Sequence, residues 1–191
     1  MKLSLPLVLA SQSPRRRELL GQLVNCFEQR SADIDEVRQS GESPSSYVAR
    51  LAREKAQTIA HSTADKWVLG ADTIVVLGSR IFEKPADEAD CLATLSLLSG
   101  QTHQVMTAVA LCKGEQLLQQ TVISDVTFRT LSRSEIQAYW QTGEPADKAG
   151  SYGIQGLAGC FVSHLSGSYS AVVGLPLCQT HQMLQAAIKE S

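Results

Sequence analysis

The sequence predicts a protein that contains both helices and strands, with at least one strand buried inside a sheet. Residues 7–20 run from a short apolar stretch through small polar residues into an apolar helical pattern, which predicts a strand, a tight turn and a helix. Residues 67–77 are continuously apolar and β-branched, as in a central strand covered on both faces. Two long strand patterns, Thr102–Cys112 and Gln116–Phe128, meet across Lys113-Gly114-Glu115 and predict an antiparallel hairpin.

The helices have recognisable beginnings and ends. Ser13 and Ser43 are each followed by proline, the pattern of an N-cap and a first helical position. A third helix is expected from about Asp87 to Leu98, and the capping box Ser132–Glu135 predicts a fourth. The remaining expectations are a turn at Gly78-Ser79, a short strand ending at Glu83-Lys84-Pro85, a glycine-rich loop over Gly143–Gly159, a strand over Cys160–Leu165, a turn at Gly167-Ser168-Tyr169 and a last helix after Gly174-Leu175-Pro176.

The composition is that of an ordinary globular protein. The 191 residues allow one domain, or two small lobes that share a core, with 43% hydrophobic and 19% charged residues. A net charge of −2 provides no general basic field for nucleic acid, so any phosphate must be bound by a local cluster. The five cysteines lack the spacing of a zinc site, which favours a reduced, cytosolic setting. The N-terminus fits neither a signal peptide nor a membrane span, and no membrane partner is expected.

Three arginines, Arg15, Arg16 and Arg17, fall in the first turn of the first helix. The helix dipole makes cations unfavourable at this end of a helix. A bound anion would make the same arginines favourable, because they and the free backbone N–H groups could all face it. The sequence therefore allows either a phosphate site or a solvated basic face, and the strand-to-helix context favours the phosphate site.

An acidic segment, Arg30–Glu36, follows this helix. Asp33, Asp35 and Glu36 repel one another unless water, a cation or arginine neutralises them. A solvated loop and a metal site both remain open at this point.

Asp72 interrupts the most apolar strand of the chain. A carboxylate removed from water there is costly unless it is paired or bound to a metal. A functional role is favoured over a structural one, in which an arginine and backbone amides would satisfy the side chain. Gly70 and Ala71 leave room for a ligand or another backbone to approach.

Further candidates complete a possible polyphosphate site. Lys55 lies near the edge of the apolar stripe of the second helix, Lys84 lies near the start of a loop, and the glycine-rich tract is either a flexible surface loop or one that closes on a ligand. Carboxylates without His or Cys partners suit Mg²⁺ or Mn²⁺. The sequence contains no P-loop and no nucleophile elbow, and its histidines are isolated.

Four stretches in order along nearly the whole chain resemble the Maf family of nucleotide pyrophosphatases: Leu9–Arg16, Leu69–Thr73, Glu83–Pro85 and Lys148–Gly156. This resemblance implies an α/β fold, a central mixed β-sheet flanked by helices and two lobes with a cleft between them, in a single domain over 1–191. It also implies hydrolysis of a nucleoside triphosphate to the monophosphate and pyrophosphate with a divalent cation. The Ala149–Gly156 tract looks like the branch of the family that acts on dTTP and UTP.

The resemblance assigns a role to each candidate residue. Asp72 is the expected catalytic proton acceptor and, with Glu36, a metal ligand for Mg²⁺ or Mn²⁺. Arg15, Thr73 and Gln155 are the expected specificity positions, and the carboxamide of Gln155 suits the O4 and N3–H edge of uracil or thymine. The expected phosphate-contacting residues are Ser11, Arg16, Lys55 and Lys84.

The expected reaction is attack of a metal-activated water on the α-phosphate of dTTP, UTP or modified pyrimidine nucleotides, in a cytoplasmic homodimer. Such an enzyme would keep modified nucleotides out of nucleic acids and influence cell division. One alternative is a nucleotide-sensing division-control protein without significant turnover. Another is a pyrophosphatase for a methylated purine nucleotide. The family resemblance is what names the substrate, because composition and spacing by themselves predict only a polyphosphate site.

Overall fold

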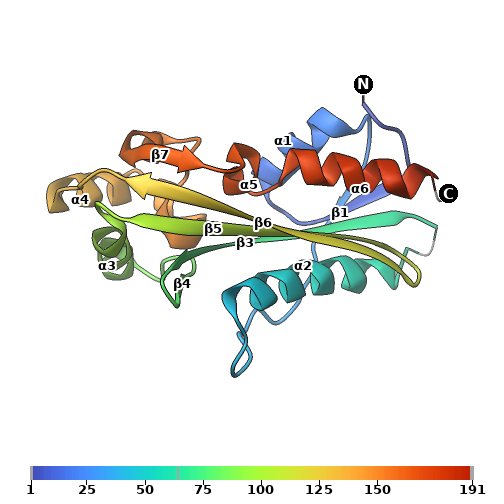
Figure 1. Cartoon of the computed structure of the whole chain (residues 1–191), viewed down its shortest axis with the longest axis horizontal. Coiled ribbons are helices and arrows are strands. Elements are labelled where there is room, and N and C mark those ends of the chain that lie inside the picture. Colours follow the sequence, from blue (N-terminus) through green and yellow to red (C-terminus); the bar gives the residue numbers. More distant parts are fainter. Residues whose placement is uncertain (1, 64, 190–191) are drawn as a thin grey trace. The chain divides into compact units, whose positions relative to one another are not determined.

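The structure, a computed structural model, describes residues 2–63 and 65–189. Its sheet has the order β2-β1-β3-β5-β6-β7, with β4 paired to β3 (Figure 1). β1 pairs in parallel with both of its neighbours, whereas β6 and β7 are antiparallel. The expected α/β class, with a central mixed sheet flanked by helices, is therefore confirmed. The cleft between two lobes stays a prediction.

The chain divides into two compact units. Unit 1 is Met1–Asp72, Thr107–Val122 and Gly174–Ser191, and unit 2 is Thr73–Met106 and Ile123–Val173. The boundaries fall inside or beside three long strands, which are β3 (Trp67–Leu77), β5 (Thr102–Lys113) and β6 (Gln116–Phe128). β5 and β6 are neighbours joined by two residues, a connection short enough only for the antiparallel hairpin that was expected.

Unit 1 contains the predicted N-terminal strand, turn and helix. β1 (Leu7–Ala10) lies between β2 (Glu28–Arg30) and β3, and α1 (Pro14–Leu23) contacts α6 (Leu177–Lys189). The Ser13 hydroxyl accepts from the backbone N–H of Arg16, which confirms the cap. α2 (Pro44–Ala60) contacts β1 and buries its whole predicted apolar stripe: Tyr47, Val48, Leu51, Ala52, Ala56 and Ile59.

Gly70 lets α2 lie directly against β3. A methyl group at this position would be 2.2 Å from the carbonyl oxygen of Ala52 and 2.7 Å from the backbone nitrogen of Ala56. The room expected beside Gly70 for a ligand or another backbone is therefore occupied by the backbone of α2. This contact matters for the site because Lys55, which lies between those two alanines in the sequence, belongs to the same turn of α2.

Unit 2 is built on an aromatic and aliphatic core. α3 (Glu88–Leu98) starts at the N-cap Asp87, and α4 (Arg133–Gln141) starts with the predicted Ser132–Glu135 capping box. β4 (Arg80–Phe82) pairs with β3, and β7 (Val162–Ser166) pairs with β6. The largest members of the core cluster are Phe82, Leu95, Leu98, Phe128, Leu131, Ile136, Tyr139, Tyr152 and Phe161.

The structure corrects several local expectations. The Gly143–Gly159 stretch contains 3₁₀ turns, η1 (Glu144–Asp147), η2 (Ala149–Ser151) and the start of η3 (Leu157–Phe161), which have no apolar periodicity to reveal them. Because η3 includes Cys160 and Phe161, β7 begins at Val162 rather than Cys160. α5 (Tyr169–Val173) replaces part of the expected turn, and the Ser168 hydroxyl accepts from the Ala171 N–H at its start.

The acidic segment was also assigned too broadly. Arg30 is the last residue of β2, a strand of three exposed residues paired only with β1. Its charged and polar sequence carries no alternating pattern, so its pairing was not predictable from periodicity.

None of the helices in residues 2–63 and 65–189 combines the length and the apolar character that a membrane span requires.

Replacing Gly70 with alanine should lower the free energy of unfolding by about 3 kcal/mol or more, because the new methyl group meets helix backbone that cannot move aside locally. Urea denaturation measures this loss. Gly21→Ala is the matched control, since Gly21 lies within α1 with nothing near its missing side chain. That variant should gain up to about 1 kcal/mol from helix propensity. Equal stability of the two variants would contradict the close approach of α2 to β3.

Candidate active site

Unit 1 brings together five of the residues selected from the sequence: Ser11, Arg16, Glu36, Lys55 and Asp72. At the centre is the Lys55 ammonium group, which lies 2.6 Å from Oδ1 of Asp72 and 2.7 Å from Oε1 of Glu36. One cation therefore bridges a carboxylate from β3 and a carboxylate from the segment before α2. Residues that are 17 to 36 positions apart in the sequence converge on one point.

Burial makes this arrangement unusual. Asp72 is 7% exposed and Lys55 8% exposed, whereas the Glu36 side chain is about half exposed at 52%. The partner that satisfies Asp72 is a lysine from α2, not the arginine considered from the sequence. A buried ion pair of this kind stabilises the fold no more than apolar residues of the same size would. Its presence therefore favours a functional role over a structural one.

Arg16 lies in the electric field of the same carboxylates. Burial lowers the pKa of the Arg16 guanidinium, and the positive charge of Arg15 lowers it further. The negative charges of Asp72 and Glu36 act in the opposite direction. Its Nε donates to the carbonyl oxygen of Gly174 at 3.0 Å, and its Nη1 lies 3.4 Å from the Ser11 hydroxyl. The first turn of α1 thus places one arginine where the charges of both carboxylates act on it.

The other residues of that turn are placed differently. Arg15 is half-buried and Arg17 is exposed. The Ser11 hydroxyl accepts from the backbone N–H of Ser13 at 3.2 Å, so the strand end and the helix cap are tied together. This connection fixes the turn that carries Ser11 and Arg16.

Unit 2 holds the remaining three candidates. Thr73 is half-buried in β3, while Lys84 and Gln155 are exposed. The backbone N–H of Gly150 donates to the carbonyl oxygen of Glu83 at 3.1 Å, which attaches the chain next to Lys84 to the glycine-rich tract. That these residues and those of unit 1 act on one ligand stays a prediction.

A hydrogen-bonded network holds the glycine-rich tract around Gln155. The Glu144 carboxylate accepts from the N–H groups of Leu157 at 2.9 Å and Ala158 at 3.4 Å, the first two residues of η3. It also accepts from the Tyr139 hydroxyl at 2.8 Å, which in turn accepts from the N–H of Gly153. Burial raises the pKa of Glu144, but these donors outweigh it and the pKa lies below its ordinary value.

Two glycines of the tract lie close to neighbouring side chains, and Gly156 lies against the carboxylate at the centre of this network. A methyl group at Gly156 would lie 2.4 Å from the Glu144 carboxylate, and one at Gly153 would lie 2.6 Å from Cε of Lys148. The conformation around Gln155 therefore depends on the close approach of Gly156 to Glu144 in η1.

An aromatic group anchors the start of the tract. The Tyr152 hydroxyl is 2.8 Å from Nε2 of His103, and both rings meet Phe128 edge to face. Burial lowers the pKa of His103 to about 4, so the ring is neutral at physiological pH. Glu144 and Tyr139 were not selected from the sequence.

Glu36 and Asp72 are the two residues that the sequence predicts as metal ligands. Within residues 2–63 and 65–189, no group of three or more His, Cys, Asp or Glu side chains is arranged to do so. Two carboxylates nevertheless suffice for Mg²⁺, which takes its other oxygen ligands from water and from substrate phosphates. Both carboxylates already reach one cationic group, Lys55, so their geometry suits a cation.

Comparison with known proteins extends over nearly the whole chain. The family described as Maf-like protein matches residues 6–187. A protein of Shigella sonnei named dTTP/UTP pyrophosphatase is 56% identical, over 93% of this chain and 91% of that protein. Proteins with the same name from Colwellia psychrerythraea (53% identical; 95% and 88% covered) and Salmonella typhimurium (58% identical; 93% and 91% covered) are also similar.

Among solved structures, the Staphylococcus aureus Ham1 protein is similar with a TM-score of 0.43 and 13% identity, over 64% of this chain and 71% of that one. This likeness is too limited to support a conclusion.

Glu144→Gln should destabilise unit 2 by about 1–3 kcal/mol, because an amide N–H₂ would oppose backbone donors that the carboxylate now satisfies. Hydrogen exchange should show faster exchange at Gly153, Leu157 and Ala158. Asp147→Asn serves as the control, since that carboxylate is exposed at the surface, where it forms an ion pair with Lys148. Unchanged protection in Glu144→Gln would show that the network does not hold the tract.

Proposed function

This chain belongs to the family of Maf-like proteins, and on that premise we propose that it hydrolyses dTTP and UTP to the nucleoside monophosphate and pyrophosphate. The names of relatives more than half identical over most of the chain support this substrate choice. The observation that carries the proposal is the buried Asp72–Lys55 pair with Glu36 on the same ammonium group. The proposed substrates also include modified pyrimidine nucleotides.

Glu36 and Asp72 would hold a divalent cation, Mg²⁺ or Mn²⁺, between the protein and the triphosphate. When bound, such a cation neutralises phosphate charge and makes water more acidic. The carboxylate pair without His or Cys neighbours supports a hard, oxygen-seeking cation rather than zinc.

The protein's own groups divide the remaining work. Asp72 accepts the proton of the water that attacks the α-phosphorus, and Lys55 holds the Asp72 carboxylate in a fixed orientation. Arg16, Lys55 and Ser11 bind phosphate oxygens as negative charge moves onto the departing pyrophosphate. Burial of Asp72 and Lys55 strengthens these interactions, since little water competes with them.

Base recognition is assigned to Arg15, Thr73 and Gln155, with Lys84 as a further phosphate contact. The Gln155 carboxamide both donates and accepts, as the O4 and N3–H edge of uracil or thymine requires. The Glu144 network supports this role because it fixes the backbone on both sides of Gln155. The family resemblance also leads us to propose that the enzyme is a cytoplasmic homodimer. Its proposed cellular roles are to remove modified nucleotides and to influence cell division.

Asp72→Asn should reduce release of pyrophosphate from dTTP with Mg²⁺ by about 10²- to 10⁴-fold, because the amide cannot accept the proton. Binding of dTTP, measured by calorimetry, and the thermal unfolding temperature establish that the variant is folded. Asp125→Asn is the control, and it should keep wild-type turnover because Asp125 is exposed in β6. Wild-type activity in Asp72→Asn would refute the role of Asp72. Tight dTTP binding by the wild-type protein without pyrophosphate release would refute the enzyme.

A further inference from the structure

The segment that carries Glu36 has almost no apolar anchorage. Residues 31–43 contain no helix or strand and no buried residue, and Val37, beside Glu36, is 67% exposed. Apolar packing therefore cannot fix this segment. Its position must come from polar contacts.

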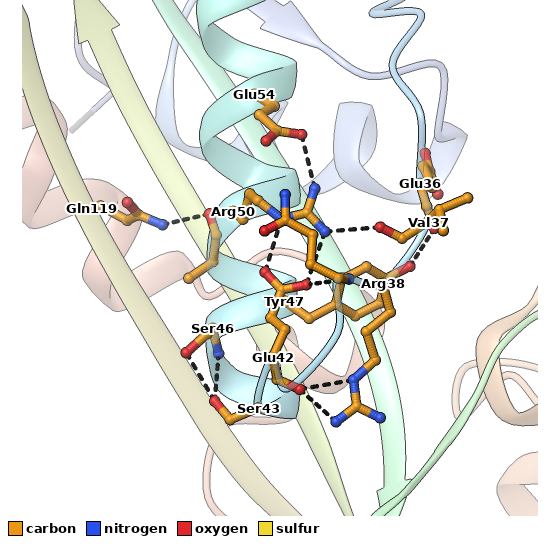
Figure 2. A network of polar contacts seen from close by, with 12 residues as sticks. Glu36, Val37, Arg38, Glu42, Ser43, Ser46, Tyr47, Arg50, Glu54 and Gln119 are labelled. Carbon is orange, nitrogen blue, oxygen red and sulfur yellow. Dashed lines mark hydrogen bonds and ion pairs between the residues drawn. The ribbon is translucent and has the colours of Figure 1, made fainter.

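Two side chains of α2 bind the backbone of this segment at the position of Glu36. The Tyr47 hydroxyl donates to the carbonyl oxygen of Glu36 at 2.5 Å, and Nη2 of Arg50 donates to the carbonyl oxygen of Val37 at 3.0 Å (Figure 2). Tyr47 and Arg50 are themselves buried, at 2% and 9% exposure. The anchoring groups are thus fixed, and the chain they hold is exposed.

Arg50 is held in place by a second residue of the segment. Its Nε and Nη2 donate to the two oxygens of Glu42 at 2.8 and 2.9 Å, and its Nη1 donates to Glu54 at 3.1 Å. The Arg50 hydrogen bonds lower the pKa of Glu42 to about 2, so this pair stays charged throughout the physiological range. The guanidinium also lies 5.5 Å from the centre of the Tyr47 ring.

The segment also binds to itself. Arg38 donates to the carbonyl oxygen of Glu42 (Figure 2). The backbone N–H of Gln39 donates to the Glu42 carboxylate. Residues 36–42 therefore form one polar unit attached to α2 through Tyr47 and Arg50. The same helix carries Lys55, which the Glu36 side chain contacts.

We infer that Tyr47 and Arg50 are positioning residues that hold the Glu36 carboxylate beside Lys55 and Asp72, and so set the affinity of the site for its divalent cation. This inference rests on the proposed function, in which Glu36 and Asp72 act together. A helix cap alone does not explain the contacts, because Ser43 already caps α2. Both contacts instead fall on the carbonyl groups of Glu36 and its neighbour.

The test is a double-mutant cycle between Tyr47→Phe and Glu36→Gln. Tyr47→Phe removes the hydroxyl that donates to Glu36 and keeps the ring, so it should raise the Mn²⁺ concentration at half-maximal dTTP hydrolysis by about 3- to 10-fold. Mn²⁺ binding in the presence of a non-hydrolysable α,β-imido analogue of dUTP, followed by electron paramagnetic resonance, should weaken by the same factor. In the Glu36→Gln background, Tyr47→Phe should add nothing.

Two further variants sharpen the result. Ser46→Ala removes an exposed hydroxyl from the same turn of α2 and should match the wild type. Arg50→Lys keeps the charge but loses the paired geometry toward Glu42, and it should act in the same direction as Tyr47→Phe. Hydrogen exchange should be faster in residues 36–42 of both Tyr47→Phe and Arg50→Lys.

The outcomes separate the inference from the proposed function. If Glu36→Gln alone changes neither turnover nor Mn²⁺ binding, the role of Glu36 in the proposed function fails. If Glu36→Gln is impaired while Tyr47→Phe matches the wild type, the inference is overturned. Equal effects of Tyr47→Phe in both backgrounds would also overturn it, because the hydroxyl would then act on the fold rather than through Glu36.

Discussion

The rest of the site depends on one buried ammonium group, that of Lys55, between the carboxylates of Asp72 and Glu36. Asp72 could not occupy a buried strand position without such a partner, because an unpaired charge there would cost several kcal/mol. Lys55 in turn needs α2 to lie close to β3, which Gly70 permits by having no side chain. A glycine, a lysine and an aspartate therefore form one dependent set, although only Asp72 would draw attention as a charged residue in an apolar strand.

The two units hold their exposed functional segments by the same physical means. In unit 1 the segment with Glu36 is fixed by side chains of α2 that donate to its backbone carbonyls. In unit 2 the tract with Gln155 is fixed by Glu144, which accepts from its backbone N–H groups. The segment with Glu36 has no buried residue, so it depends on these polar groups, whereas the tract with Gln155 is also anchored by the buried Tyr152. Such segments are suited to binding a highly charged substrate, because their polar side chains remain accessible to it.

The sequence predicted the elements whose signals are local. Ser13-Pro14 and Ser132–Glu135 marked helix starts that the structure confirms, and the apolar run at 67–77 marked β3 with its exact bounds. The 3₁₀ turns, α5 and the charged strand β2 were missed because short or exposed elements carry no periodic pattern. The candidate residues Ser11, Arg16, Glu36, Lys55 and Asp72 came together as a set, but their supports did not come from the sequence. Arg50 pairs with Glu42 and Tyr139 pairs with Glu144 through side-chain geometry that spacing alone does not determine.

The central claim is that Asp72, Lys55 and Glu36 form the reacting centre. A crystal of the protein with Mn²⁺ and the α,β-imido analogue of dUTP tests it most directly, through the anomalous signal of manganese. The account predicts one strong peak at ligand distance from a carboxylate oxygen of Asp72 and one of Glu36, with the α-phosphate beside it. Lys55 should keep its contact with Asp72 and donate to a phosphate oxygen as well. A manganese peak and a nucleotide bound away from these three residues would contradict the account.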